Sequence, residues 1–240
     1  MRAALTARAF SPFYQLGRWL RRWVTRLVLL VVALVFAIVL ANSVINPTIT
    51  HYMTVEGRRL GGIDRIWVPI EDVAPVMARS IVAAEDANFC THWGFDMRAI
   101  RAVIEQGGAG GASTISQQVV KNVYLWQGRS WVRKALEAVL TPLVEALWSK
   151  QRIIEIYMNI AEFDEGVFGV EAAARHYFNI GPEALSARQA ARLAAILPAP
   201  KTRSASNPSS RTQRRAAQIM DGAATIRVDG RAECFAVNSD

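Results

Sequence analysis

An unbroken apolar run near the N-terminus constrains this chain more than any other feature. Residues 27–41 contain no polar or charged side chain, and the first acidic residue of the chain is Glu56. A helix needs roughly 20 mainly apolar residues to cross the hydrocarbon core of a bilayer. With Trp23 at one interface and the Arg26 side chain reaching back to the headgroups, we predict a transmembrane helix over residues 23–45.

The charges before this run predict its orientation. Residues 1–22 form an arginine-rich segment without acidic residues, and flanks of this kind stay in the cytoplasm. The rest of the chain is therefore expected on the outer side. The alternative is a cleaved signal peptide, because Val39-Leu40-Ala41 resembles a cleavage site. The long arginine-rich lead and the length of the apolar run favour an anchor. The six leading arginines are Arg2, Arg8, Arg18, Arg21, Arg22 and Arg26.

Length and charge bound the remainder of the chain. It has 240 residues, which suits an anchor and one globular domain. Six of the 28 basic residues precede the apolar run, which leaves 22 basic against 20 acidic residues. Most of the basic excess therefore lies in the segment before the membrane helix, where it indicates orientation in the membrane, and it does not indicate nucleic-acid binding. The two cysteines, Cys90 and Cys234, are compatible either with free thiols or with one disulfide in an oxidising compartment.

Helical spacing dominates the exported part, so we predict a mainly α domain over residues 70–222. Residues 46–69 form a short segment of mixed polar and apolar composition that tolerates β structure, and we interpret it as a juxtamembrane stalk. Residues 223–240 are interpreted as a C-terminal tail, partly disordered. Helices are predicted from Pro75, after Thr114, over 131–159 with an interruption or kink near Pro142, over 171–178, after Ser186 and over 212–220. The inner face predicted for the helix over 131–159 consists of Leu136, Val139, Leu140, Leu143 and Leu147.

A first polar cluster follows the helix that begins at Pro75. Glu85 lies four residues after Ile81 and four before Phe89, within an otherwise apolar stripe. Apolar surroundings raise the pKa of a carboxyl toward the range of a general acid or base. Asp86 or His92 could then orient it. The simpler interpretation is an acid at a helix end with a histidine satisfied elsewhere.

A second cluster surrounds a predicted helix start after a run of glycines. Backbone N–H groups at a helix start, together with hydroxyls, amides and a lysine, suit an anionic ligand. A capping box formed by Thr114 and Gln117 explains part of this cluster without a ligand, but it does not explain Gln118, Lys121 and Asn122. The candidate binding residues are Ser113, Thr114, Gln117, Gln118, Lys121 and Asn122.

A third cluster combines cations with one carboxylate. Arg133 and Glu137 share a helix face, Arg129 lies one turn earlier, and Lys134 follows Arg133. A surface ion pair is the simpler interpretation and would contribute little to stability. The functional interpretation is a cationic wall for phosphate groups with a carboxylate beside it.

Taken together, these clusters resemble the glycosyltransferase family 51 domain, and most closely its monofunctional biosynthetic peptidoglycan transglycosylases. The chain contains Glu-Asp-x-x-Phe-x-x-His from Glu85, Gly-Gly-x-Ser-Thr-Ile-x-Gln-Gln-x-x-Lys-Asn up to Asn122, and Arg-Lys-x-x-Glu from Arg133, in the family's order. A fourth stretch of the family follows over residues 150–159, and the resemblance spans about residues 70–200. It implies a lysozyme-like, two-lobed domain behind the transmembrane helix.

The resemblance implies transfer of a lipid-linked glycan chain onto the GlcNAc 4-hydroxyl of lipid II, with inversion to a β-1,4 link and release of undecaprenyl pyrophosphate. Glu85 and Glu137 would be the catalytic carboxylates, with Glu85 as the base supported by Asp86, Phe89 and His92. The second and third clusters would bind substrate and pyrophosphate: Ser113, Thr114, Gln117, Gln118, Lys121, Asn122, Arg129, Arg133 and Lys134.

The resemblance also implies the partners and the location. It implies no tightly bound cofactor, although Mg²⁺ or Mn²⁺ could accompany the pyrophosphate and meet Glu137. The expected partners are lipid II, the growing strand, the bilayer and proteins of wall synthesis or division, without nucleic acid. The expected location is the bacterial inner membrane, in a single pass with a cytoplasmic N-terminus and a periplasmic domain.

Two other functions fit parts of the pattern. A membrane-anchored, lysozyme-like lytic enzyme also uses carboxylates in a mainly α domain. Such an enzyme cuts neutral sugar links and has no need for Lys121, Arg129 and Arg133 near its acids. A non-catalytic scaffold for wall-synthesis proteins is disfavoured because the acids and cations are all present.

Overall fold

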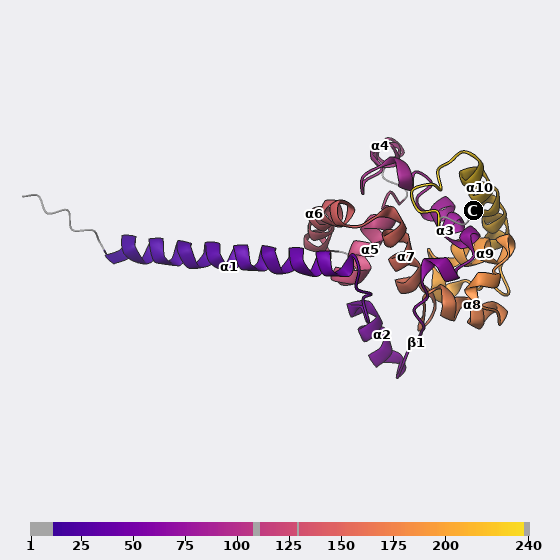
Figure 1. The fold of residues 1–240 in the computed structure, drawn as a ribbon, viewed down its shortest axis with the longest axis horizontal. Coiled ribbons are helices and arrows are strands. Elements are labelled where there is room, and N and C mark those ends of the chain that lie inside the picture. The colour runs from indigo at the N-terminus through magenta and orange to yellow at the C-terminus, as the bar shows by residue number, and fades with distance from the viewer. Residues whose placement is uncertain (1–11, 108–110, 129, 238–240) are drawn as a thin grey trace, which may run out of the picture.

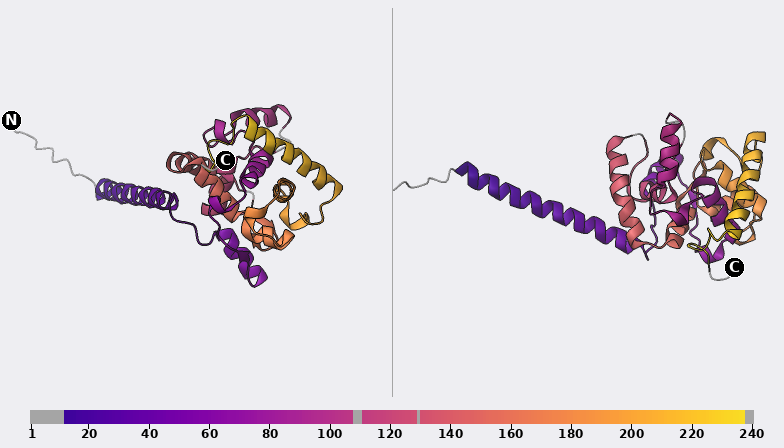
Figure 2. Two further views of the ribbon diagram at one scale, coloured as in Figure 1. Left: turned by 45° about the vertical axis from the view of Figure 1, so that its right-hand side comes forward. Right: turned by 90° about the horizontal axis from the view of Figure 1, so that it is seen from above.

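The computed structural model describes residues 12–107, 111–128 and 130–237, with the backbone alone at 12–14. Helices dominate these residues, as predicted, and the strands are short. The long helix α1 (Pro12–Asn42) projects from a compact domain, and all the views agree on this arrangement (Figures 1 and 2). Within the described ranges, the segment long and apolar enough to cross a membrane is Gln15–Asn42 of α1.

The domain contains two groups of helices. In one, α3 (Pro75–Glu85), α9 (Ala187–Ile196) and α10 (Ser210–Val228) pack against one another. In the other, α5 (Ile115–Tyr124) packs against α6 (Trp131–Leu147) and α7 (Lys150–Ile160). Figure 1 shows the second group beside the C-terminal end of α1, and α9 and α10 at the opposite end of the domain.

Short elements complete the domain. A small sheet has the order β1 (Asp64–Arg65), β3 (Val167–Phe168), β2 (Glu162–Asp164), with β1 parallel and β2 antiparallel to β3. The other helices are α2 (His51–Leu60), α4 (Met97–Glu105) and α8 (Val170–Phe178). The 3₁₀ turns are η1 (Ile70–Asp72), η2 (Phe89–Thr91), η3 (Pro182–Ala184) and η4 (Pro200–Thr202).

The β-tolerant stalk predicted over residues 46–69 is wrong for the first part of this segment, although Asp64–Arg65 do form strand β1. Residues 51–60 form α2, which begins after the cap residue Thr50 and ends at Gly61 in the left-handed conformation. Met53 is fully buried in the main core, so this segment is part of the domain. The Thr50 side chain accepts a hydrogen bond from the Met53 N–H, a capping signal that the sequence does contain.

The helical segment predicted over 131–159 is present, but its predicted interruption or kink near Pro142 is misplaced, because α6 continues through Pro142 to Leu147 and the break falls at Trp148. Trp148 takes an extended conformation, and Ser149 caps a new helix by accepting a hydrogen bond from the Arg152 N–H. The buried face of α6 consists of Glu137, Thr141, Val144 and Glu145. Of the predicted inner face, Val139 is 70% exposed and Leu136 is 40% exposed, while Leu140, Leu143 and Leu147 are partly buried.

The C-terminal residues are ordered beyond the predicted tail boundary. Helix α10 continues to Val228, and Cys234 forms a disulfide with Cys90, which settles the alternative left open by the sequence. Phe235 is buried against Phe89, with ring centroids 6.2 Å apart. The segment up to residue 237 is therefore part of the core rather than a disordered tail.

Candidate active site

Glu85 is the last residue of α3 and is partly buried. Burial raises the pKa of its carboxyl, because the charged form loses water. The Gln118 amide on α5 donates a hydrogen bond to Glu85 Oε2 at 2.9 Å and, with the charges of Arg215 and Lys121, acts in the opposite direction on this pKa. Glu85 therefore has the mixed environment of a carboxylate that can both hold and lose a proton.

Tyr157 on α7 fixes the orientation of the Gln118 amide. Its hydroxyl donates to Gln118 Oε1 at 3.2 Å, so the amide nitrogen is left facing Glu85. Burial raises the pKa of the Tyr157 hydroxyl well above its ordinary value, which keeps it a donor. Residues of α3, α5 and α7 thus meet in one hydrogen-bonded chain. The sequence analysis assigned no role to Tyr157, and its place in the family-like stretch over residues 150–159 is the one signal that could have indicated it.

Asp86 and His92 lie behind Glu85 rather than against it. Asp86 Oδ1 lies 2.8 Å from His92 Nε2, and Asp86 Oδ2 accepts a hydrogen bond from the Ile115 N–H at 3.0 Å. The His92 carbonyl accepts a hydrogen bond from Lys150 Nζ at 2.9 Å. Asp86 therefore connects the end of α3 to the start of α5, and its support of Glu85 is indirect.

Phe89 supports the same turn from inside the core. It is fully buried, and the Lys150 ammonium lies 4.3 Å from the centroid of its ring. The Cys90–Cys234 disulfide and the contact with Phe235 attach this turn to the C-terminal segment. Phe89 contributes packing to the position of the residues after Glu85.

The predicted capping box at the start of α5 is present. Thr114 Oγ1 donates to the Gly94 carbonyl at 2.7 Å, and Gln117 Oε1 accepts a hydrogen bond from the Thr114 N–H at 3.1 Å. Both side chains are buried and occupied by these bonds. Gly94 has φ +83°, and a Cβ there would lie 2.6 Å from a Thr141 side-chain carbon. Contact of Thr114 or Gln117 with substrate stays a prediction.

Glu137 gathers two of the predicted cations. It is buried on α6, and Arg133 Nη1 lies 3.2 Å from its Oε2 while the Lys134 ammonium contacts its Oε1. Arg133 also donates to the Gly128 carbonyl at 2.8 Å, and Lys134 lies 3.5 Å from Ser113 Oγ. The carboxylate therefore holds both cations in place. Arg129 lies outside the described residues.

Lys121 lies between this cluster and Glu85. Burial lowers the pKa of its ammonium, and the positive charges of Arg133 and Lys134 act in the same direction, while Glu137 and Glu85 oppose them. No hydrogen bond or ion pair from the described residues holds this ammonium. A partly buried cation without a fixed partner is suited to an anionic ligand.

A polar cavity of about 410 Å³ opens beside these side chains. Gln118, Lys121 and Asn122 line one wall, and Asn122 Oδ1 accepts a hydrogen bond from the Gln127 amide at 3.0 Å. The lining also includes Tyr52, Glu162, Pro198, Lys201 and Thr202. We call the space lined by these residues the polar cavity.

The wall of Tyr52 and Glu162 was missed by the sequence interpretation. The Tyr52 hydroxyl donates to Glu162 Oε2 at 2.5 Å, and burial raises the pKa of the Glu162 carboxyl. Lys201 joins this group through an ion pair with Glu56 at 2.9 Å. Tyr52 and Glu56 fall in the segment interpreted as a stalk, which is why they were not considered.

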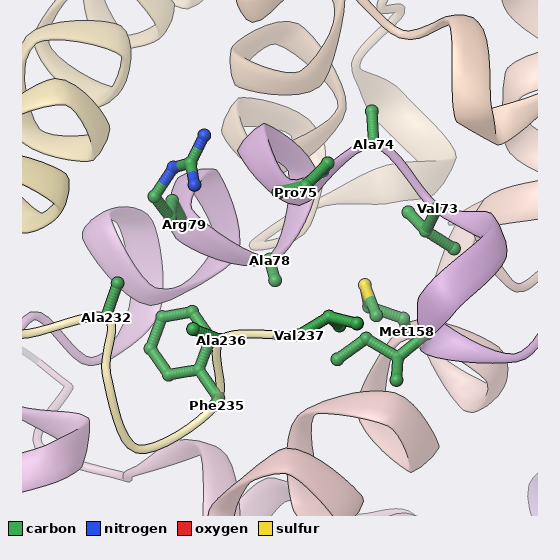
Figure 3. A pocket seen from close by; sticks show the side chains of 11 residues that line it. Val73, Ala74, Pro75, Ala78, Arg79, Met158, Ala232, Phe235, Ala236 and Val237 are labelled. Atoms are coloured by element: carbon green, nitrogen blue, oxygen red, sulfur yellow. The ribbon is translucent and has the colours of Figure 1, made fainter. Parts of the chain in front are cut away.

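Another cavity, of about 20 Å³, lies between α3 and the C-terminal segment (Figure 3). Its lining is mostly apolar and includes Val73, Ala78, Met158 and Phe235, with Arg79 at one side. A space of this size without acidic or hydroxyl side chains does not offer the groups that catalysis needs. It is a packing gap behind the site.

The described residues offer no ready ligand set for a resident metal ion. Among them, no group of three or more His, Cys, Asp or Glu side chains comes together. Both oxygens of Glu137 already contact cations. A divalent ion that arrives with a pyrophosphate stays a prediction, and no step below depends on it.

Comparison with known proteins gives a consistent result. A family model described as "Transglycosylase" matches residues 54–224. A biosynthetic peptidoglycan transglycosylase from Jannaschia sp. (strain CCS1) is 60% identical over 194 residues, 81% of each chain. A protein of the same name from Pseudomonas fluorescens (strain SBW25) is 51% identical over 172 residues, 70% of this chain and 72% of the relative. A third protein of this name, from Caulobacter vibrioides (strain ATCC 19089 / CIP 103742 / CB 15), is 43% identical over 196 residues, which are 80% of this chain and 86% of the relative.

Proposed function

Because this chain belongs to the transglycosylase family and is a peptidoglycan glycosyltransferase, we propose that it polymerises glycan strands from lipid II at the outer face of the membrane. The observation that carries the proposal is that Glu85 lies near a cluster of cations. A partly buried carboxylate with a raised pKa lies within the electrostatic influence of Lys121, whose ammonium lacks a fixed partner in the described residues.

In the proposed reaction, Glu85 removes the proton from the GlcNAc 4-hydroxyl of lipid II. That oxygen forms a bond to C1 of the MurNAc at the reducing end of the growing chain, while the bond from C1 to the pyrophosphate oxygen breaks. The electron pair leaves with undecaprenyl pyrophosphate, and the α-linked donor becomes a β-1,4 link. A single inverting displacement needs one base and a stabilised leaving group, without a covalent nucleophile.

The cations are proposed to stabilise the leaving group. Lys121, Arg133 and Lys134 would face the pyrophosphate, and Glu137 would keep the latter two in position. Gln118 would keep Glu85 correctly oriented. Asn122 and Gln127 line the polar cavity and would contact sugar hydroxyls or phosphate.

The anchor gives this chemistry its location. Helix α1 is consistent with a single-pass membrane anchor, and the arginines before it support a cytoplasmic N-terminus. Both substrates are lipid-linked and stay in the same bilayer. The proposed location of the domain is therefore the periplasmic side of the inner membrane.

The geometry disfavours a lytic enzyme with two opposed carboxylates. Asp86, the acid nearest to Glu85 in the chain, is buried and committed to His92 and the Ile115 N–H. Glu137 is also buried, and both of its oxygens contact Arg133 and Lys134. A two-carboxylate hydrolase needs both acids at the scissile bond. The cationic cluster beside Glu85 serves a charged leaving group instead.

A polymerisation assay tests the proposal. The full chain in detergent or liposomes is mixed with labelled lipid II, and the products are separated by size. We expect polymeric glycan from the wild type and none from Glu85→Gln. Release of sugars from finished cell wall, without polymer from lipid II, would contradict the proposal.

A further inference from the structure

The charged side chains in the region of α9, η4 and the first half of α10 are all positive. Between Glu183 and Asp221 the chain contains no acidic residue. The same stretch contains seven basic residues, whereas the chain after the six leading arginines is close to charge balance. The seven are Arg188, Arg192, Lys201, Arg203, Arg211, Arg214 and Arg215.

Four of these arginines line one groove. It has a volume of about 650 Å³ and is lined by Arg203, Arg211, Arg214 and Arg215, together with Pro198 and polar residues of α10. We call these four side chains the arginine groove. Arg211, Arg214 and Arg215 are exposed, so the groove is accessible from solvent.

No carboxylate forms an ion pair with the arginine groove within the described residues, although the charge of Arg215 acts on Glu85 at longer range. Arg203 donates to the Ala195 carbonyl and Arg215 to the Ala84 carbonyl, both at 2.9 Å, and these acceptors are neutral. Arg211 and Arg214 make no hydrogen bond or ion pair there. Elsewhere, arginines commonly pair with an acid: Arg59 with Glu56, Arg133 with Glu137, Arg152 with Glu155 and Arg175 with Glu171. Four like charges without an ion-paired carboxylate favour an anionic ligand.

The arginine groove adjoins the candidate active site. Arg215 binds the carbonyl of Ala84, the residue before Glu85. Pro198 lines both the arginine groove and the polar cavity that contains Gln118 and Lys121. A polymer in the polar cavity could therefore continue past Pro198 into the arginine groove.

The position of α9 and α10 indicates what kind of anion this is. Both helices lie at the end of the domain opposite to α1 (Figures 1 and 2). A membrane around α1 would be remote from them, which disfavours lipid headgroups. Guanidinium groups bind carboxylates through paired hydrogen bonds, and the peptide stems of peptidoglycan carry carboxylates at regular intervals along the strand.

We propose that the arginine groove binds the carboxylates of the peptide stems on the glycan strand next to the site of bond formation. This inference rests on the proposed function and adds a strand-binding surface to it. The arginines would hold the polymer between successive transfers, so they should influence strand affinity and strand length more than the rate of a single transfer.

Strand binding without catalysis tests the inference directly. The probes are soluble, lipid-free glycan strands that carry peptide stems, and the same strands after an amidase has removed the stems. The full chain is compared with Arg211→Gln/Arg214→Gln and with Arg214→Gln alone. Arg227→Gln is the matched control, because Arg227 is also exposed on α10 but does not line the groove.

We expect the wild type to bind stem-bearing strands more tightly than stripped ones, with an affinity that falls as salt rises. The Arg214→Gln variant should bind stem-bearing strands about threefold more weakly and the double variant about tenfold, as expected for exposed charge pairs. Stripped strands and Arg227→Gln should show little change. Unchanged affinity in the double variant, or an equal loss for stripped strands, would overturn the inference.

Two further measurements separate this inference from the proposed function. Vesicles with anionic lipids replace the strands in one arm, and a loss confined to vesicles in the double variant would overturn the inference in favour of a lipid site. Lipid II polymerisation by the wild type tests the proposed function alone. A wild type that polymerises, paired with a double variant of unchanged strand affinity, overturns only the inference. A wild type that binds strands through the arginines without polymerising overturns only the proposed function.

Discussion

At the scale of single residues, Glu85 is governed by opposing influences. Burial raises the pKa of its carboxyl, while the Gln118 hydrogen bond and the charges of Arg215 and Lys121 lower it. A base must be deprotonated before the reaction yet accept a proton during it. The balance between burial and these three neighbours suits that requirement better than a fully solvated carboxylate would.

The Glu85→Gln variant should lose activity without losing stability. The pKa of Glu85 is raised in the folded state, so its ionised form is less favourable in the folded than in the unfolded protein. At pH values above the folded pKa, this difference lowers the free energy of unfolding. The effect vanishes below the unfolded pKa of about 4.3. The variant should therefore unfold at the same or a higher temperature than the wild type at neutral pH, and any advantage should shrink as the pH falls toward about 4. A clear drop in its melting temperature at neutral pH would contradict this account.

The Gln118→Leu variant should move the acid limb of the pH–rate profile. Removing the amide donor removes a hydrogen bond that lowers the pKa of Glu85, so that pKa should rise further. A larger fraction of Glu85, the proposed base, is then protonated at a given pH, and the loss of rate should be greater near pH 6.5 than near pH 8.5. Gln127→Leu is the matched control, because its amide bonds Asn122 rather than Glu85. Parallel profiles for both variants would argue against a direct effect on Glu85.

At the scale of elements, local signals predicted what local forces determine. The capping pairs Thr114–Gln117 and Ser186–Gln189 mark α5 and α9, and both boxes are formed in the structure. Pro75 opens α3 and Glu85 ends it. These features depend on residues three or four positions apart, which the sequence shows directly. The candidate site residues on these helices were therefore predictable.

What the sequence did not predict depends on tertiary packing. The break at Trp148 interrupts an apolar pattern that continues through it, and the break becomes intelligible once the Trp148 indole binds the Val39 carbonyl. The buried face of α6 carries Glu137 and Glu145, whose burial depends on Arg133, Lys134 and Lys150. Hydrophobic spacing selects leucines for that face instead. The role of Tyr157 likewise exists only where α3, α5 and α7 meet.

The Cys90–Cys234 disulfide should stabilise the turn after Glu85. It connects residues 144 positions apart and attaches the segment after α10 to η2. Removing a bridge across a loop of this length should cost about 2–5 kcal/mol of unfolding free energy. Urea unfolding of Cys90→Ser/Cys234→Ser checks this value. Reductant should destabilise the wild type and leave the double variant unchanged; equal stability of the two proteins without reductant would show that the bridge contributes little.

At the scale of the whole molecule, the C-terminal end of α1, the proposed anchor, is docked onto the domain rather than loosely attached. The Trp148 indole donates to the Val39 carbonyl at 2.8 Å, and the Asn42 amide donates to the Tyr124 hydroxyl at 3.1 Å. Arg152 donates to the carbonyls of Asn42 and Ile45. These contacts restrict the tilt of the domain relative to α1, and hence the height of Glu85 above a membrane.

The neighbouring surface fits this position. Trp131, Val132 and Val139 of α6 are strongly exposed, and α6 packs near the C-terminal end of α1. Exposed apolar side chains beside a transmembrane helix are expected to enter the interfacial region of the bilayer. The domain would then be held at the membrane by the docked helix end and by this face of α6.

The Arg152→Ala variant tests whether this docking matters. The substitution removes hydrogen bonds to the carbonyls of Asn42 and Ile45, so the chain between α1 and α2 should open more often. Limited proteolysis should then cut residues 43–50 severalfold faster than in the wild type, and polymerisation of lipid II in liposomes should fall although the cavity residues are intact.

Arg175→Ala is the control for that experiment. Arg175 also forms an ion pair, with Glu171 at 2.6 Å, but it lies on α8 away from the junction and its side chain is 60% exposed. Its loss should change neither cleavage nor activity appreciably. If Arg152→Ala cleaves and polymerises like Arg175→Ala, the anchor acts as a simple tether. If only Arg152→Ala is impaired, the docking of α1 on the domain contributes to the proposed reaction with lipid-linked substrates.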